Sequence, residues 1–176
     1  MRKAWQGWKA AVHFVSKVLA WIAGLSILMI ILVLLREAFG RYLFNSPTTF
    51  AYSVAGVTSI VVLYFGIAYT AGRDGHVASD LIFEHLPPRG KRVVSIVGDI
   101  IATTIGALIA YYMARQAGHS LRTEAVIQDL FDMPQAYLQL VIVVGSGLFA
   151  LVAATKALDH IANFNELPIG EEPANE

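Results

Sequence analysis

One carboxylate, Asp99, lies inside an apolar stretch, residues 93–114, that carries no other charge. An ionisable side chain inside a membrane helix is a candidate for proton or cation transport, because its burial in lipid costs roughly 3 kcal/mol. Asp99 is only about six residues, or roughly 9 Å, from the predicted start of its helix. Lys91 and Arg92 are within reach at that end. We therefore favour a structural ion pair, within the chain or with a partner, over a proton or cation site.

The histidines do not form a catalytic or cofactor-binding pattern. They are His13, His76, His85, His119 and His160, and all lie outside the centres of the apolar stretches. A four-helix haem protein needs axial histidines that face one another inside the bundle, so haem binding is excluded. The chain has no cysteine, which excludes thiolate metal sites, disulfides and cysteine nucleophiles. The sequence predicts no metal and no cofactor.

A serine between two glycines, Ser146, is the remaining candidate nucleophile. Residues 144–147 do not have the G-x-S-x-G spacing of a serine hydrolase, and their apolar stretch contains no histidine to act as a base. The chain also has no phosphate-binding loop and no paired catalytic carboxylates. We therefore expect no catalytic residue and no enzyme activity.

The elements that hold these residues are four apolar stretches. They are residues 18–35, 42–72, 93–114 and 133–155, and only Asp99 among them is charged. About 20 helical residues span a hydrocarbon core of about 30 Å, and backbone groups in lipid must be paired within the protein. The sequence therefore predicts an all-α integral membrane protein with four transmembrane helices, at about residues 14–36, 48–72, 93–114 and 134–156.

The composition leaves room for one membrane domain, residues 1–165. Hydrophobic residues make up 56% of the chain and charged residues 15%, whereas soluble domains average about 25% charged. Residues 4–17 combine Trp5 and Trp8 with lysines, which predicts an interfacial helix before the first span. Residues 77–86 predict a short helix on the inner membrane surface, and residues 166–176 an acidic, disordered tail.

The basic residues predict the orientation of the chain. Nine of the 13 Lys and Arg residues lie in the N-terminal segment, the loop after the second span and the C-terminal segment. Membrane proteins carry an excess of Lys and Arg on the cytoplasmic side, so we expect both termini in the cytoplasm. The net charge is zero and no basic patch is present, so we expect no nucleic-acid partner.

The third span carries a small residue at every fourth position. These residues are Gly98, Ala102, Gly106, Ala110 and Ala114. Small side chains allow close approach of a second helix, which matters where lipid provides no hydrophobic drive for association. We expect this stripe to be a face for subunit packing.

Several short motifs together resemble the small membrane subunit of the tripartite ATP-independent periplasmic (TRAP) transporters. They are Arg41–Ser46 after the first span, Gly66–Ala68 in the second, Arg73–Asp80 and Leu86–Arg89 in the inner loop, and Met133–Pro134 before the fourth span. Their order, the four helices and the chain length all agree with that family. Two positions depart from it: Phe50–Tyr52 lack the acidic residue that many members carry, and Val143–Gly145 keep only the glycine of a Pro-x-Gly.

The resemblance implies a bacterial inner-membrane transport complex. A periplasmic binding protein captures a substrate, commonly an organic acid, and a much larger membrane subunit imports it with a sodium gradient. The small subunit holds no transport site, scaffolds the large subunit and helps to dock the binding protein. His76 and Asp80 match the family's inner-surface motif, for which we favour a structural role. The partners implied are the large subunit, the binding protein and membrane lipid.

Charged residues in the two outer loops are the candidates for docking. They are Arg36, Glu37, Arg41, Arg122 and Asp129. A soluble partner that is caught and released in each cycle needs a weak, partly electrostatic contact. Two alternatives stay open: a small four-helix proton-coupled antiporter, which would need a central carboxylate, and a membrane scaffold protein outside transport.

Overall fold

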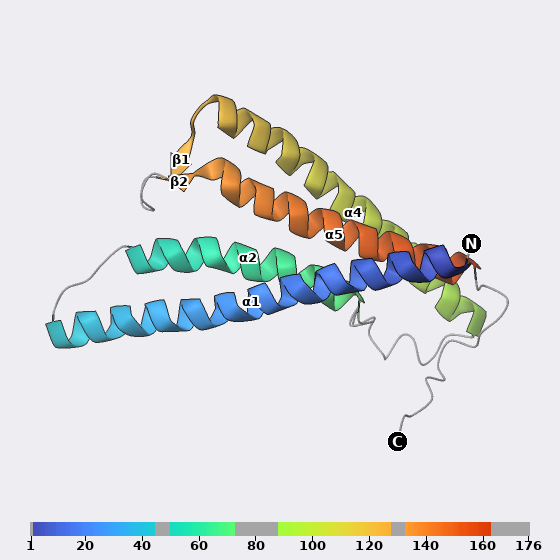
Figure 1. The fold of residues 1–176 in the computed structure, drawn as a ribbon, viewed down its shortest axis with the longest axis horizontal. Helices are drawn as coiled ribbons and strands as arrows, with labels where there is room; N and C mark the ends of the chain where they lie inside the picture. Colours follow the sequence, from blue (N-terminus) through green and yellow to red (C-terminus); the bar gives the residue numbers. More distant parts are fainter. Residues whose placement is uncertain (1, 45–49, 73–87, 128–132, 163–176) are drawn as a thin grey trace, which may run out of the picture.

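The computed structural model describes residues 2–44, 50–72, 88–127 and 133–162 (Figure 1). Four helices span α1 (Arg2–Phe44), α2 (Phe50–Gly72), α4 (Pro88–Arg122) and α5 (Gln135–Ala162). All four are long and apolar enough to cross a membrane, which confirms the predicted all-α membrane architecture. Two strands of two residues each, β1 (Val126–Ile127) and β2 (Met133–Pro134), were not predicted.

The helices form two antiparallel hairpins, α1 with α2 and α4 with α5, and the contact between α2 and α5 joins them. Figure 1 shows the hairpins meeting at the end that holds the N-terminus and spreading apart toward the opposite end. We call the first the terminal end and the second the loop end. At the loop end, β1 and β2 lie in the connection from α4 to α5 and pair antiparallel, so the chain reverses direction there.

The helices continue beyond the predicted membrane spans. The amphipathic N-terminal segment and the first span form one helix of 43 residues, about 65 Å long. Likewise, α4 runs to Arg122 and α5 to Ala162. Charged residues end the apolar stretch but do not end a helix, which stops only where backbone geometry or proline forces it. After α4, the amide of Ala125 donates to the carbonyl of Ser120 (3.2 Å), and Glu124 has a φ of 48°.

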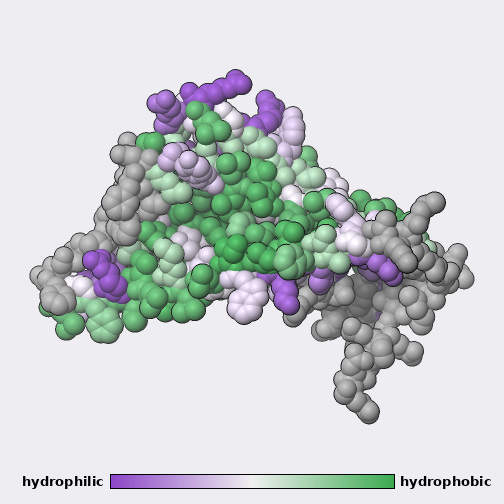
Figure 2. Space-filling view, in the orientation of Figure 1, coloured by the Kyte–Doolittle hydropathy of each residue, from purple (hydrophilic) through white to green (hydrophobic). Residues whose placement is uncertain are grey.

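Most of the buried apolar residues in the described helices are alanines. The buried side chains include Ala51, Ala68, Ala71, Ala136 and Ala153, whereas large ones such as Trp21 and Leu25 are exposed. A space-filling view shows a broad hydrophobic surface, with hydrophilic residues gathered toward the ends of the helices (Figure 2). This distribution is typical of a chain whose outer surface contacts lipid or other membrane helices.

Candidate functional sites of the membrane domain

Asp99 pairs with His160 near the terminal end. Its Oδ2 lies 2.8 Å from Nδ1 of His160, and α4 and α5 supply one residue each. The Asp99 side chain is 10% exposed and that of His160 is 36% exposed. An ionised carboxylate only accepts hydrogen bonds. When Asp99 is ionised, the hydrogen of this bond therefore lies on Nδ1 of His160. Asp99 therefore has a contact within the chain, and its partner is a histidine from the neighbouring helix.

A second carboxylate of α5, Asp159, connects the start of α1 to the end of α5. The indole nitrogen of Trp5 donates to Oδ1 of Asp159 (3.0 Å), and Nζ of Lys9 forms an ion pair with its Oδ2 (2.5 Å). One turn earlier in α5, the indole nitrogen of Trp8 donates to Oγ1 of Thr155 (3.4 Å). The amphipathic segment predicted for the membrane surface thus packs directly on α5.

The crossing of α2 and α5 depends on Gly145. A Cβ at this position would lie 2.6 Å from Cβ of Tyr64 and 2.7 Å from its carbonyl oxygen. The backbones of the two helices therefore approach each other at a distance that only glycine permits. Two residues later, no atom lies within 4 Å of a Cβ placed on Gly147.

The small-residue stripe of α4 divides into two parts. A Cβ on Gly106 would lie 2.8 Å from Cδ1 of Phe149 and 3.1 Å from Cβ of Ala150, so this glycine packs against α5 of the same chain. Gly98 and Ala114 are exposed, and no atom lies within 4 Å of a Cβ placed on Gly98. Part of the stripe is therefore occupied within the chain, and the part around Gly98 is open.

An apolar groove runs along this open part. Residues of α2, α4 and α5 line it. Its volume is about 320 Å³. The residues that line it are Tyr64, Ile67, Gly98, Ile101, Ala102, Ile105, Gly106, Ile109, Ser146 and Phe149. Ser146 does not present a free hydroxyl to it, because its Oγ donates to the carbonyl of Ile142 (2.6 Å). The groove has the surface chemistry of a helix-packing or lipid-packing face.

The charges near the end of α1 have different surroundings. Glu37 is buried, with 4% exposure, and lies 3.7 Å from Arg41. Arg41 also donates to the hydroxyl of Tyr52 on α2 (3.1 Å). Glu37 and Arg41 therefore help to hold α1 against α2. Arg36 and, on α4, Arg122 are exposed.

The sequence does not reveal two features of these sites, and some predicted positions are not described. These features are the contact of His160 with Asp99 and the close approach of α2 to Gly145. The histidine and aspartate of the inner-surface motif (His76 and Asp80), the inner-surface helix, Asp129 and the acidic tail lie outside the described residues. Among the residues that are described, no group of three His, Cys, Asp or Glu side chains is placed to hold a metal ion.

Comparison with known families decides what kind of protein carries these sites. Residues 30–163 match the family described as tripartite ATP-independent periplasmic transporters, DctQ component. The chain belongs to this family. The match covers α2, α4, α5 and the last part of α1, from residue 30 on, so the DctQ component is a multi-pass membrane subunit of a transporter, as the motifs predicted.

Two relatives support this assignment. A TRAP transporter small permease protein of Haemophilus influenzae is 26% identical over 98 residues, which cover 56% of this chain and 59% of the relative. The ectoine TRAP transporter small permease protein TeaB of Halomonas elongata is 26% identical over 98 residues, which cover 56% of this chain and 51% of TeaB. The alignments therefore span little more than half of either relative. No solved structure matches the chain.

Proposed function

We propose that this DctQ component is the small membrane subunit of a sodium-coupled, binding-protein-dependent importer of organic acids in the bacterial inner membrane. In this complex it scaffolds the large transport subunit and helps to dock the periplasmic binding protein. Both termini face the cytoplasm, so the loop end faces the periplasm. The observation that carries the proposal is the family match over residues 30–163, which include α2, α4, α5 and the last part of α1.

The described helices support a scaffolding role. Substrate sites in secondary transporters are built from interrupted helices near the middle of the membrane. Among the residues described here, each of the four helices is continuous from its first residue to its last. Asp99, the carboxylate that an antiporter would need, is paired with His160 near one end of the membrane domain. This arrangement favours a subunit that supports transport by a partner over a self-sufficient antiporter.

The open part of the small-residue stripe provides a test of assembly. We expect Gly98→Leu to reduce co-purification of the large subunit severalfold, because a leucine there would keep a partner helix away. The isolated chain should keep its thermal stability, because the space around Gly98 is open. Pull-down of the large subunit in mild detergent and a melting curve of the chain measure the two effects.

Gly106→Leu is the matched comparison, on the same face two turns away. Its side chain would collide with Phe149 and Ala150, so it should lower the melting temperature of the chain itself. If Gly98→Leu leaves co-purification unchanged, the stripe does not bind the large subunit, and the scaffolding contact must lie on another face.

The exposed arginines of the loop end provide a test of docking. We expect Arg36→Glu combined with Arg122→Glu to lower uptake roughly tenfold at limiting binding-protein concentration and low salt, because electrostatic attraction raises association rates by about 10–1000-fold. Uptake assays in proteoliposomes, with the binding protein varied, measure this effect. The loss should shrink as salt screens the charges.

Two controls separate docking from damage to the complex. The double variant must still co-purify with the large subunit, and the binding protein must keep its substrate affinity. Arg115→Gln removes an arginine from the same helix as Arg122 and should leave docking unchanged. Full uptake by the double reversal would place the docking surface on the large subunit.

A further inference from the structure

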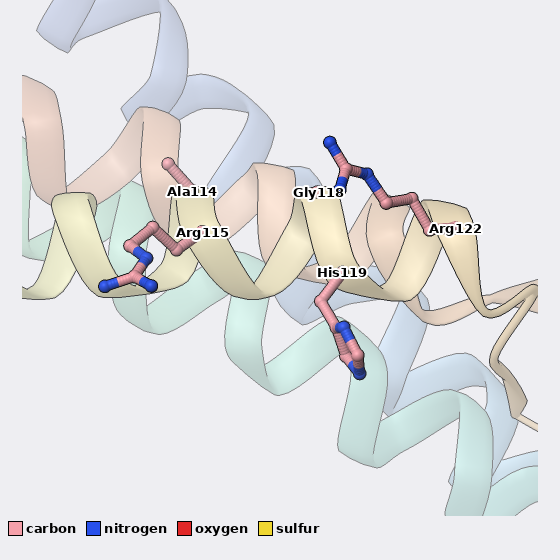
Figure 3. Close-up of a pocket in the computed structure, with 5 residues that line it drawn as sticks. All are labelled: Ala114, Arg115, Gly118, His119 and Arg122. Carbon is pink, nitrogen blue, oxygen red and sulfur yellow. The ribbon is translucent and has the colours of Figure 1, made fainter.

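The surface of the last turns of α4 carries an open cationic cavity at the loop end. Its volume is about 280 Å³. The residues that line it are Ala114, Arg115, Gly118, His119 and Arg122 (Figure 3). Two of these residues are small and three have nitrogen-bearing side chains, and no carboxylate belongs to the lining. The cavity is therefore suited to an anionic group.

Gly118 provides the space in this cavity. No atom lies within 4 Å of a Cβ placed on Gly118, so a side chain there would extend into the open cavity. In Figure 3 the side chain of Arg122 lies back along the helix toward Gly118, whereas the side chains of Arg115 and His119 leave the opposite side of the helix. Guanidinium groups bind phosphate oxygens through paired hydrogen bonds. Arg115 and His119, one turn apart on the same side of the helix, leave room for a phosphate beside Gly118.

The cavity lies at the depth of lipid headgroups. The apolar stretch of α4 ends at Ala114, and Arg115 follows directly. The exposed rings of Tyr111 and Tyr112 precede it, and the Arg115 guanidinium lies 6.0 Å from the centre of the Tyr111 ring. Tyrosines are enriched at the level where hydrocarbon meets headgroups. Arg115 is therefore placed among phosphates rather than in free solution.

The same face of the helix continues into an apolar surface. Leu108, Tyr111, Arg115, Gly118 and Arg122 follow one another at three- and four-residue steps, which place them on a single face. Leu108 and Tyr111 on this face are exposed. This face therefore has two parts. The apolar part lies at the level of the lipid acyl chains, and the cationic part next to it lies at the level of the phospholipid headgroup.

We propose that this face of α4 is a binding site for an anionic phospholipid, whose phosphate is held by Arg115 and His119 beside Gly118. The acyl chains lie along Leu108 and Tyr111. This site does not depend on the transport activity proposed above. Its residues form a surface for lipid rather than for the acidic side chains of a soluble protein, because the cavity opens at headgroup depth and adjoins exposed apolar side chains.

Lipid titration of the full chain in a neutral detergent tests the proposal. Native mass spectrometry measures binding of short-chain phosphatidylglycerol, with phosphatidylcholine for comparison. We expect phosphatidylglycerol to bind more tightly and Arg115→Gln to weaken it roughly tenfold, the loss expected for a hydrogen bond to a charged group. Gly118→Leu keeps every charge but fills the cavity, so it should cause a similar loss.

Gly24→Leu is the matched control, because it also places a leucine in open space on a helix, in α1. It should leave phosphatidylglycerol binding unchanged. Equal binding of the two lipids, or normal binding by both Arg115→Gln and Gly118→Leu, would overturn the proposal. Displacement of the lipid by millimolar inorganic phosphate would identify a site for free anions instead. If the variants keep the lipid but no longer capture the binding protein, the cavity is a protein-docking site.

Discussion

Replacement of Gly145 by alanine should separate α2 from α5 and prevent the two hairpins from packing together. The new Cβ would lie 2.6 Å from Cβ of Tyr64, 2.7 Å from its carbonyl oxygen and 2.8 Å from its carbonyl carbon. These are largely backbone atoms, so a change of side-chain rotamer cannot relieve the collision. Overpacking of a tight core costs about 1–3 kcal/mol, and a collision between two helix backbones should reach the upper end of that range or exceed it.

Gly147→Ala is the control for this prediction, because it makes the same chemical change two residues away in open space. A glycine within a helix is less stable than alanine by about 0.5–1 kcal/mol, so Gly147→Ala should leave stability unchanged or raise it slightly. Thermal unfolding of the two variants in detergent, followed by size-exclusion chromatography, distinguishes them. Equal melting temperatures would mean that α2 and α5 do not cross at Gly145.

The four spans could be predicted because absence of charge over about 20 residues has a single physical explanation in a chain of this size. The ends of the helices could not be predicted in this way. Lys9 and Lys17 limit the hydrocarbon span of the first helix, but no proline interrupts residues 2–44, so α1 continues through both lysines. A membrane span ends where charge begins, whereas a helix ends where its backbone hydrogen bonding ends.

The contact of Asp99 with His160 could not be predicted from the sequence. Lys91 and Arg92 were considered because they are close in sequence, whereas His160 is 61 residues away and beyond the predicted end of its span. The antiparallel register of α4 and α5 brings them together: it sets Gly106 beside Ala150, and Asp99 therefore within one turn of His160. That register depends on the loop between the helices and on side-chain packing, neither of which is encoded by hydrophobic periodicity.

The glycines illustrate the same limit. The spacing of Gly98 and Gly106 predicts a face for subunit packing. In the structure Gly106 packs against α5 of the same chain, and the space around Gly98 is open. The sequence could not distinguish which glycines contact the chain's own α5 and which remain open to another subunit. Similarly, Gly145 and Gly147 look equivalent in the sequence, but only the first of them lies against α2. The direction of a helix face is fixed by the neighbouring helices, which a single sequence does not reveal.

Removal of His160 should destabilise the chain more than removal of its partner. In His160→Leu, the carboxylate of Asp99 remains in a site that exposes only 10% of its side chain, without its hydrogen-bond donor. Breaking one side of a fully buried ion pair costs about 3–5 kcal/mol. The His160 side chain is 36% exposed, so water can reach the site, and we expect a smaller loss of about 1–3 kcal/mol.

Asp99→Leu should cost less, because it leaves a partly exposed imidazole that water can hydrate. The double variant should be more stable than His160→Leu alone, since replacement of both members of a buried pair by apolar residues is often neutral or stabilising. A double-mutant cycle of unfolding free energies in detergent measures this rescue. Additive losses would show that the two side chains are not coupled. In that case the carboxylate of Asp99 would be stabilised by other groups, and the contact between α4 and α5 at the terminal end would rest on apolar packing.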